Sequence, residues 1–568
     1  MRRTYAFIIA SIGTCFVAWA SLFIYRSSII GIDGRRYFCL WDDSMISMRY
    51  AWNFSHGFGL VWNSGEYVEG YTNPLMTLLM ALATLLFNKV EAVLAIQILG
   101  IIFVLVNAYL IVSIAKHLVP EPEGYRLLFL ALALICALSY YPLLYSSLMG
   151  MDTGLLMVLM SLSILSALMY AKDRRPAQAV LLSISLGLAF LTRMDTVVFA
   201  VPIFVHAFYA RLRTDRSTRS LSFLFAMGGL YALFVIGQEL FRWSYYGEWL
   251  PNTYTLKISG IPLSTRIDNG MNFVAPFLTE LYIPLIIVGA AILFAFGKEK
   301  LSFGKEKLLL VSVFAALITY QVWAGGDNWK YWRMLSPAVP LLLVVGTHEI
   351  LRAIQTVFAT EGIQRYLLRN PIFPRRYIPI IFTCLLVGGM LWSVNSRFLP
   401  EITMLQEAYQ MGLNNNRVNT ALAIEQVTTP DATVGVFAAG TIPYYSGRPA
   451  IDFLGKSDRR IARLAPNLSG PVTGDSTMIY GPGHNKYDLE YSIKELRPTY
   501  VEGFRWHRQK VVGWAKSEYV MVKYEGEPLY LLKDSGNVHW ADIEGPLRSV
   551  RGKITTFIPR PDQKTGSH

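Results

Sequence analysis

The stretch Leu40-Trp41-Asp42-Asp43-Ser44-Met45-Ile46-Ser47 decides how the rest of the chain is interpreted. It follows the first apolar run, residues 5–25, and contains two adjacent carboxylates. The surrounding loop, residues 33–89, is dense in aromatic, glycine and acidic residues and contains no apolar run long enough to cross a bilayer. Ionisable side chains at the end of a membrane span are costly in lipid, so they tend to face a polar cavity. The stretch therefore predicts the floor of a functional site at a membrane edge.

The composition is that of a membrane protein. Of the 568 residues, 53% are hydrophobic and only 16% are charged. Apolar runs long enough to cross a bilayer as helices recur along the chain, and we count roughly eleven of them. They cover residues 5–25, 91–115, 126–145, 151–170, 178–191, 196–209, 221–241, 278–296, 308–324, 334–348 and 377–394. The first run is long for a signal peptide, so we expect an uncleaved helix.

The net charge of +13 is a topology signal and does not indicate nucleic acid as a partner. Residues 74–87 are apolar but would reach only about 20 Å as a helix, short of the ~30 Å hydrocarbon core. If this segment is interfacial, the basic clusters between the spans fall on one side with hardly an exception, as the positive-inside rule predicts. They are Arg2, Arg3, Lys116, Arg126 and clusters within residues 172–175, 211–219, 298–307 and 352–376.

The opposite, outer side collects the polar segments that look least like simple connectors. These segments are residues 33–89, 150–153, 192–195, 245–272 and 325–333. The chain after residue 394 has no further span, and its strand-like pieces alternate with helical ones. The strands are expected at 433–437, 450–453, 499–502, 519–524 and 529–532, and the helices at 404–426 and 487–496. We therefore predict a membrane domain, 1–394, with its first outer loop at 26–90, and an outer α/β domain, 395–568.

The acid pair Asp42 and Asp43 has two interpretations. One carboxylate could act as a general base that accepts a proton from a hydroxyl group, and adjacent acids raise one another's pKa. Alternatively, Asp43 or Ser44 caps a helix over residues 45–53. Asp43 is the better placed of the two acids to cap, so Asp42 is slightly favoured as the base.

Several other polar residues on the outer side are candidates for binding. Asn73 followed by Pro74 has the chemistry of a helix start, which leaves Glu69 and Tyr71 as candidate substrate contacts. Arg193 either pairs with Asp195 or faces a phosphate, for which its planar fork is suited. The remaining candidates are Lys257, Arg333, His484 and Lys486 for a phosphate, and Asn252, Tyr254 and Asp327 for substrate. No sequence motif for a metal is present, and the sequence leaves a divalent-cation cofactor open.

The acid pair and four further motifs together resemble a known class of membrane enzymes. Besides the acid pair, they are Glu69-Gly70-Tyr71-Thr72-Asn73-Pro74, Tyr246-Gly247-Glu248-Trp249-Leu250-Pro251-Asn252-Thr253-Tyr254, Gly325-Gly326-Asp327 and Ala439-Gly440-Thr441-Ile442-Pro443-Tyr444-Tyr445-Ser446-Gly447. The set resembles the GT-C class of polyprenyl-phosphate-sugar-dependent glycosyltransferases. It is most similar to the bacterial arabinofuranosyltransferase branch, with its mycobacterial terminal β-(1→2)-arabinofuranosyltransferases and pilin arabinosyltransferases. Met151-Asp152 and Arg193-Met194-Asp195 depart from the Leu-Glu and Arg-Pro-Asp usual in that branch, which leaves the donor sugar open.

This resemblance implies a function and a location. The protein is expected to be a multi-pass glycosyltransferase of the bacterial inner membrane, with its catalytic acid at Asp42 or Asp43. The donor would be a polyprenyl phosphate sugar, with arabinofuranose as one candidate, and the acceptor a cell-envelope glycan or protein on the outer face. The main rival is a flippase or transporter of lipid-linked sugars, but such proteins tend to show internal repeats, and none is evident here. A third candidate is a non-catalytic envelope assembly protein.

Overall fold

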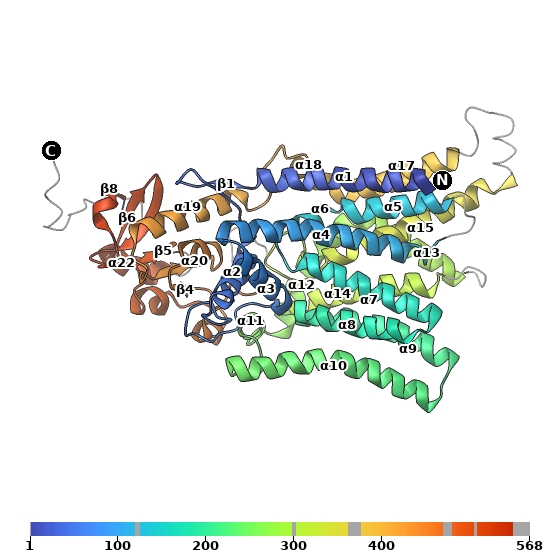
Figure 1. Ribbon diagram of the computed structural model, residues 1–568, viewed down its shortest axis with the longest axis horizontal. Helices are drawn as coiled ribbons and strands as arrows, with labels where there is room; N and C mark the ends of the chain where they lie inside the picture. Colours follow the sequence, from blue (N-terminus) through green and yellow to red (C-terminus); the bar gives the residue numbers. More distant parts are fainter. Residues whose placement is uncertain are drawn as a thin grey trace.

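The computed structural model describes residues 2–119, 125–297, 303–361, 377–469, 480–504 and 508–548. The molecule is elongated, with a bundle of long helices at one end and a smaller α/β region at the other (Figure 1). The predicted basic residues of 298–302 and 362–376 lie outside the described residues, as does the end of the chain after residue 548.

Within the described residues, eight helices are long and apolar enough to cross a membrane, and up to ten spans result if each of two bent pairs is one span. The long spans contain α1 (Arg2–Arg26), α4 (Lys89–Ala115), α7 (Thr153–Asp173), α9 (Val197–Thr214), α10 (Thr218–Tyr246), α14 (Lys305–Ala324), α15 (Val339–Phe358) and α17 (Ile378–Asn395). The bent pairs are α5 (Arg126–Ser139) with α6 (Tyr141–Leu148), and α12 (Leu263–Glu280) with α13 (Tyr282–Gly297). The predicted multi-pass helical architecture is confirmed.

One of the eleven predicted spans, at residues 178–191, does not meet the same criterion. It corresponds to α8 (Pro176–Thr192), which has only 17 residues. It packs between α7 and α10. At Gly187, an added Cβ would lie 2.2 Å from the Phe234 ring, so this glycine lets α8 and α10 approach closely. Close packing on both sides holds a helix shorter than the hydrocarbon core inside the bundle.

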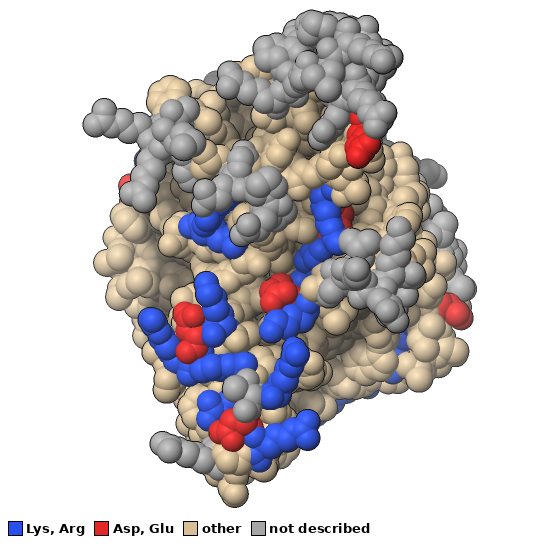
Figure 2. Space-filling view, turned by 90° about the vertical axis from the view of Figure 1, so that its right-hand side faces the viewer, with Lys and Arg blue, Asp and Glu red and all other residues tan. Residues whose placement is uncertain are grey.

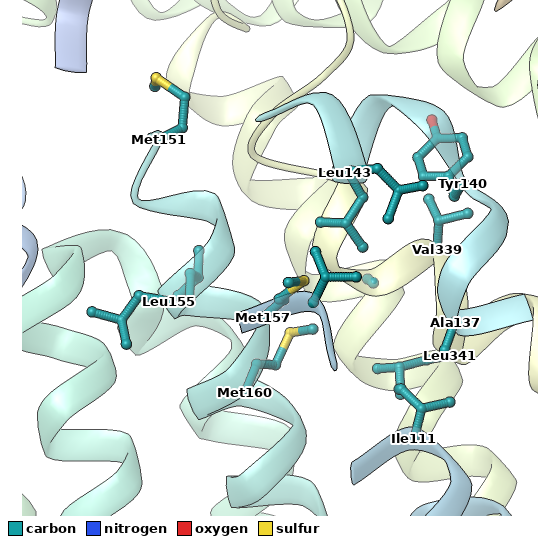
Figure 3. Close-up of a cluster of buried hydrophobic side chains, with 14 of the residues drawn as sticks. Ile111, Ala137, Tyr140, Leu143, Met151, Leu155, Met157, Met160, Val339 and Leu341 are labelled. Atoms are coloured by element: carbon teal, nitrogen blue, oxygen red, sulfur yellow. The ribbon is translucent and has the colours of Figure 1, made fainter. Parts of the chain in front are cut away.

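The buried core of the bundle lies where α4, α5, α7 and α15 meet (Figure 3). Met157 and Met160 of α7 lie among these helices, and both are completely buried. The flexible thioether side chain fills irregular gaps of this kind. Met151 belongs to the same cluster and lies at its edge, just before α7 (Figure 3), and its sulfur accepts a hydrogen bond from the Ser44 hydroxyl at 2.9 Å. The core of the bundle is thus continuous with the stretch that carries the acid pair.

Two shorter helices lie between the bundle and the α/β region (Figure 1): α2 (Asp42–Ser55) and α3 (Pro74–Leu86). The predicted helix start at residue 45 is wrong, because α2 begins at Asp42 and both acids lie in its first turn. Negative charge in the first turn is favourable, since the helix dipole is positive there. Helix α3 packs one face against α2 and exposes Leu78, Leu82 and Leu85 on the other, as an interfacial helix would.

The chain after α17 forms the predicted α/β region. Its six-stranded sheet has the order β4-β3-β5-β7-β6-β8, with β3 parallel to β4 and β5 and the remaining pairs antiparallel. The strands are β3 (Val434–Val436), β4 (Ala450–Asp452), β5 (Tyr500–Val501), β6 (Tyr519–Tyr524), β7 (Glu527–Leu532) and β8 (Glu544–Arg548). The helices are α18 (Leu399–Ile402), α19 (Met411–Val427), α20 (Thr441–Ser446), α21 (Arg459–Ala462), the π-helix η6 (Glu490–Glu495) and α22 (Arg508–Glu518).

Short elements complete the described chain. They are β1 (Ile29–Ile30) with β2 (Arg36–Tyr37), the helix α11 (Asn252–Lys257), and the 3-10 turns η2 (Met194–Thr196), η3 (Ser336–Ala338), η5 (Ser396–Phe398) and η7 (Trp540–Asp542). The end of the bundle opposite the sheet carries many Lys and Arg side chains (Figure 2). Exposed basic residues at the α7–α8 and α9–α10 turns include Lys172, Arg175, Arg213 and Arg216. The bundle thus has a basic end and an end that carries the α/β region.

Candidate active site

Two adjoining cavities lie where α2 and α11 meet the ends of the long helices. The larger has a volume of about 290 Å³ and the smaller about 40 Å³. The same five residues, Thr72, Arg193, Thr253, Lys257 and Arg333, line both cavities. We therefore treat the two cavities as one site. Its small end lies beside α2, and its large end lies between η2, α11 and α14.

Asp43 lies at the small end and is held by three donors. Its Oδ2 accepts hydrogen bonds from Arg333 at 3.0 Å and from the Trp329 indole at 2.8 Å. Its Oδ1 accepts one from the Lys456 ammonium at 2.7 Å. Burial by itself would raise the pKa of the Asp43 carboxyl, but Lys456 and Arg333 outweigh burial and hold that pKa well below its usual range. Asp43 is therefore an ionised carboxylate in the cavity wall.

Asp42 points away from the cavity and toward the α/β region. Its carboxylate accepts hydrogen bonds from the backbone amides of Gly440 and Thr441, at 3.2 and 3.0 Å, and from the Thr441 hydroxyl at 3.1 Å. Arg417 lies 3.9 Å from the same carboxylate. The acid that the sequence favoured as the base thus binds the first turn of α20. The capping argument against Asp43 is wrong, since Trp41 occupies the N-cap position of α2 and no side chain caps that helix.

The contact between Asp42 and α20 requires a glycine at position 440. A Cβ added there would lie 2.0 Å from the backbone oxygen of Asp42, closer than any real contact. We expect Gly440→Ala to lower the free energy of unfolding by about 1–3 kcal/mol, the usual effect of overpacking. Gly513→Ala is the matched control, because that glycine lies in α22 with open space around its Cβ position. Thermal unfolding of the purified protein measures both; equal midpoints would contradict the close contact.

Arg333 and Lys257 supply the positive charge at the centre of the site. Arg333 binds Asp327 through Nε at 2.6 Å and Nη2 at 3.3 Å, while its Nη1 reaches Asp43. Among the residues that the structure describes, the Lys257 ammonium has no hydrogen bond or ion pair, although it lines both cavities. Burial lowers the pKa of Lys257, while the nearby Asp327 acts in the opposite direction. Lys257 therefore lines both cavities without a partner among the described residues and is available to a ligand.

Arg193 is already neutralised. Its guanidinium binds Asp195 through Nε and Nη2, at 3.1 and 3.0 Å, and Asp152 through Nη1 at 2.9 Å. Arg193 and Asp195 line the large end, and Asp152 lines the small end. The two acids hold Arg193 in place at the wall between the two cavities.

Three of the other predicted residues lie around the first outer loop. Asn73 does not cap α3 through its side chain; its Oδ1 accepts hydrogen bonds from the hydroxyls of Ser47 at 2.9 Å and Thr77 at 3.1 Å. Asn73 and Tyr71 line the small end. Glu69 is buried against Arg242, which lines the large end in its place.

Lys486 and His484 connect the α/β region to the membrane part of the chain. Lys486 donates to the backbone oxygens of Thr255 and Ala462, at 2.8 and 2.9 Å, and does not line the described cavities. His484 contacts the Asn328 side chain at 3.3 Å. Burial, with help from Lys456, lowers the pKa of His484 to about 4, so this ring is neutral at physiological pH.

Asn252 and Tyr254 both belong to α11 but differ in their surroundings. Asn252 Nδ2 donates to the backbone oxygens of Gly455 and Lys456, at 2.9 and 2.8 Å. Tyr254 lines the large end. One side of α11 thus binds the α/β region, while the other contributes to the cavity wall.

Sequence reasoning missed Lys456 and Trp329 as partners of Asp43. Lys456 is 413 residues from Asp43, and its Asp-Phe-Leu-Gly-Lys-Ser surroundings resemble any turn after a strand. Trp329 lies in the outer segment 325–333, and its indole donates to Asp43. The signal that could have found both is the concentration of polar residues on one side of the membrane. Among the described residues, no group of three or more His, Cys, Asp or Glu side chains is arranged to hold a metal ion.

Two parts of the chain match family models. Residues 72–238 match the family described as dolichyl-phosphate-mannose-protein mannosyltransferase. Residues 402–537 match a domain of unknown function (DUF8728). No curated protein matches the sequence significantly. The first match begins at Thr72 in the cavity wall and contains Arg193.

Solved structures with the same fold cover nearly the whole chain. ArnT from Cupriavidus metallidurans bound to undecaprenyl phosphate is 13% identical, with 91% of this chain and 97% of that chain covered and a TM-score of 0.53. The oligosaccharyltransferase of Archaeoglobus fulgidus in the apo form is 11% identical, with 96% and 75% covered and a TM-score of 0.52. A likeness of this kind at such low identity shows the fold. The chain therefore has the GT-C fold of multi-pass membrane proteins, with an α/β region after its last span.

Proposed function

We propose that this protein is a membrane glycosyltransferase that moves a sugar from a polyprenyl phosphate to a hydroxyl group of a cell-envelope glycan or protein. The family model over residues 72–238 is named for a transferase with a lipid-phosphate-linked sugar donor. The ArnT structure with the same fold has undecaprenyl phosphate bound. The single observation that carries the proposal is that an ionised carboxylate, Asp43, lies in one cavity system with Lys257, whose ammonium has no partner among the described residues.

Asp43 is the proposed general base. The acceptor hydroxyl would donate its hydrogen bond to Asp43 Oδ1, which accepts from Lys456 at the small end of the site. As the acceptor oxygen bonds to the anomeric carbon, its proton passes to Asp43. The bond between that carbon and the phosphate oxygen breaks, and the polyprenyl phosphate leaves with the electron pair. Every atom is accounted for without a further co-reactant.

Lys257 and Arg333 are the proposed phosphate ligands. A leaving lipid phosphate carries about −1 to −2 charge, and fixed cations stabilise it where water is excluded. Within the part of the chain that the structure describes, Lys257 has no partner that phosphate binding would displace. Arg333 lines both ends of the site and bridges Asp43 to Asp327, so phosphate binding there is coupled directly to the base. His484 is neutral, and Lys486 is already bonded to backbone oxygens, so neither is part of the proposed phosphate site.

The large end of the site has walls suited to the first part of a polyprenyl chain. Its apolar lining comes from η2, from the residues that precede and follow α11 in the sequence, from α14 and from the segment before η3. The residues are Met194, Leu250, Pro251, Ile258, Ala324 and Met334. Next to them, the exposed rings of Trp243 and Trp249 stack at 5.6 Å, as expected for aromatic side chains at a membrane surface. The chain would therefore run from the phosphate site toward lipid.

We place the site on the outer face of the bacterial inner membrane, with residues 1–394 as the membrane domain and 395–568 as the outer domain. The support is the separation between the basic end of the bundle and the end with the α/β region (Figures 1 and 2). Arabinofuranose is the sugar that the sequence motifs favour. Incubating the purified protein with a panel of polyprenyl phosphate sugars and an envelope-derived acceptor identifies the donor; no transfer from any of them would refute the function.

The orientation can be tested with introduced cysteines. We expect Asn415→Cys in α19 to react with a membrane-impermeant maleimide on intact spheroplasts, and Ala177→Cys at the start of α8 to react only after permeabilisation. Both positions are exposed and uncharged. Cys39 is unsuitable, because it is buried and burial raises its pKa to about 12. The background should lack the two exposed native cysteines, Cys15 and Cys384. Labelling of Ala177→Cys alone on intact spheroplasts would reverse the orientation.

A further inference from the structure

Lys456 is the side chain by which the α/β region reaches Asp43 at the small end of the site, while Pro482 of the same region lines the large end. Lys456 follows β4 and donates from its ammonium to Asp43 Oδ1 at 2.7 Å. Its side chain is 11% exposed, and it lines the small end of the site with Asp43. The cation that neutralises the proposed base therefore comes from the part of the chain that matches only a domain of unknown function.

The turn that carries Lys456 is built around another acid, Asp452. Its carboxylate accepts hydrogen bonds from the backbone amides of Leu454 at 3.0 Å, Gly455 at 3.2 Å and Ser457 at 2.8 Å. Gly455 has a φ of +76°, a conformation that glycine adopts without strain. The backbone of this turn is therefore fixed from within the α/β region, and Asp452, completely buried beneath it, does not line the described cavities.

The membrane part of the chain fixes the same turn from the opposite side. Asn252 of α11 donates from one amide nitrogen to the backbone oxygens of Gly455 and Lys456. In the first outer loop, a Cβ added at Gly70 would lie 2.4 Å from the Ser457 hydroxyl oxygen and 2.9 Å from the Lys456 backbone oxygen. The backbone of Lys456 is thus held between α11, the first outer loop and its own turn. So many contacts on one short turn indicate that the position of its lysine matters.

We propose that Lys456 keeps Asp43 ionised for the transfer reaction and that Asn252 is the residue that positions Lys456. This inference rests on the proposed function, with Asp43 as the base. It gives the α/β region a direct part in the reaction and reassigns Asn252 from a substrate contact to a positioning residue. Lys456 acts through Asp43 and needs no contact with the donor.

The charged groups around Asp43 determine in which direction its pKa changes when Lys456 is lost. Arg333 and Lys257 face Asp43 from the segment before α15 and from α11, and Asp327 opposes them. Asp42 is turned toward α20, and His484 is neutral. Without Lys456, burial still raises the pKa of Asp43 and Arg333 still lowers it. The pKa of Asp43 must therefore rise, and Asp43 is protonated at a higher pH than in the wild type.

The test is the pH dependence of kcat/KM for the acceptor in Lys456→Met, Asn252→Ala and the wild type, with Lys494→Met as the control. Lys494 is an exposed lysine of η6 in the same region. In Lys456→Met, we expect the acidic limb of the curve of kcat/KM against pH to move to higher pH by about one to three units, the effect of one close opposite charge. Asn252→Ala should shift it in the same direction by less, and Lys494→Met should leave it unchanged. The ratio of wild-type to Lys456→Met activity then grows as the pH falls.

A structural role for Lys456 would give a different result. It would lower activity by the same factor at every pH and leave the acidic limb in place, and this outcome would overturn the proposal. Lys456→Arg, which keeps the positive charge, should return the limb to its wild-type position. If Lys456→Met does not fold, Asn252→Ala carries the test, because it removes no charge; an unshifted limb in that variant would also refute the proposal. Absence of transfer in the wild type would instead refute the proposed function.

Discussion

Asp43→Asn is expected to lower the rate of sugar transfer by about 10²-fold to 10⁴-fold, the scale of a positioned general base. Asparagine has nearly the same size and can still accept hydrogen bonds from Arg333, Trp329 or Lys456, so the site should keep its shape. It cannot take up a proton at neutral pH. Transfer rates at saturating donor and acceptor, together with thermal unfolding, separate the loss of the base from a loss of folding.

Asp42→Asn is the matched control on the neighbouring residue. Its carboxylate binds the first turn of α20 and does not line the described cavities. We expect this variant to lose some thermal stability and to retain most of its transfer activity. The reverse result, with Asp42→Asn inactive and Asp43→Asn active, would move the base to Asp42, which the acid pair alone had favoured.

Lys257→Ala is expected to lower kcat/KM for the polyprenyl phosphate donor by about 10²-fold to 10³-fold, as for loss of one group that stabilises developing negative charge. The reason is that Lys257 has no competing partner among the described residues and lines both ends of the site. Donor titration at fixed acceptor measures the effect. Lys330→Ala is the control, since Lys330 is exposed and lies over the Tyr409 ring, away from the described cavities.

Arg333→Lys tests the second phosphate ligand without removing its charge. A lysine cannot reproduce the fork that binds Asp327 and reaches Asp43 at the same time. We expect weaker use of the donor with folding largely preserved. Unchanged donor kinetics in both Lys257→Ala and Arg333→Lys would show that the phosphate binds elsewhere.

The helical architecture could be predicted from the sequence because a bilayer imposes a length on every span. That length separated the spans from α3, which has 13 residues and lies beside α2. Alternating patterns also located β3 to β7, whereas β8 was missed, since Glu544-Gly545-Pro546-Leu547-Arg548 has neither the alternation nor the composition of a strand. The start of α2 was placed three residues late, because a carboxylate at a helix start can act as a cap or lie in the first turn.

The candidate site could be predicted only in part. The polar segments on one side of the membrane, together with the motifs, indicated Asp43, Lys257, Arg333 and Asp327, and all four line the cavities. The sequence could not show which acid of the pair faces the cavity. That choice depends on Gly440 and Thr441, about 400 residues later, which take Asp42 away from it. Lys456 was missed for the same physical reason, since a single long-range ion pair leaves no local pattern.

The most direct test of the account is a stoichiometric transfer assay with one polyprenyl phosphate sugar in sealed liposomes. We expect the wild-type protein to release one polyprenyl phosphate for each sugar that appears on the acceptor, and Asp43→Asn to release almost none. Movement of intact lipid-linked sugar between leaflets, equal in the wild type and Asp43→Asn and without sugar on the acceptor, would contradict the account and indicate a transporter.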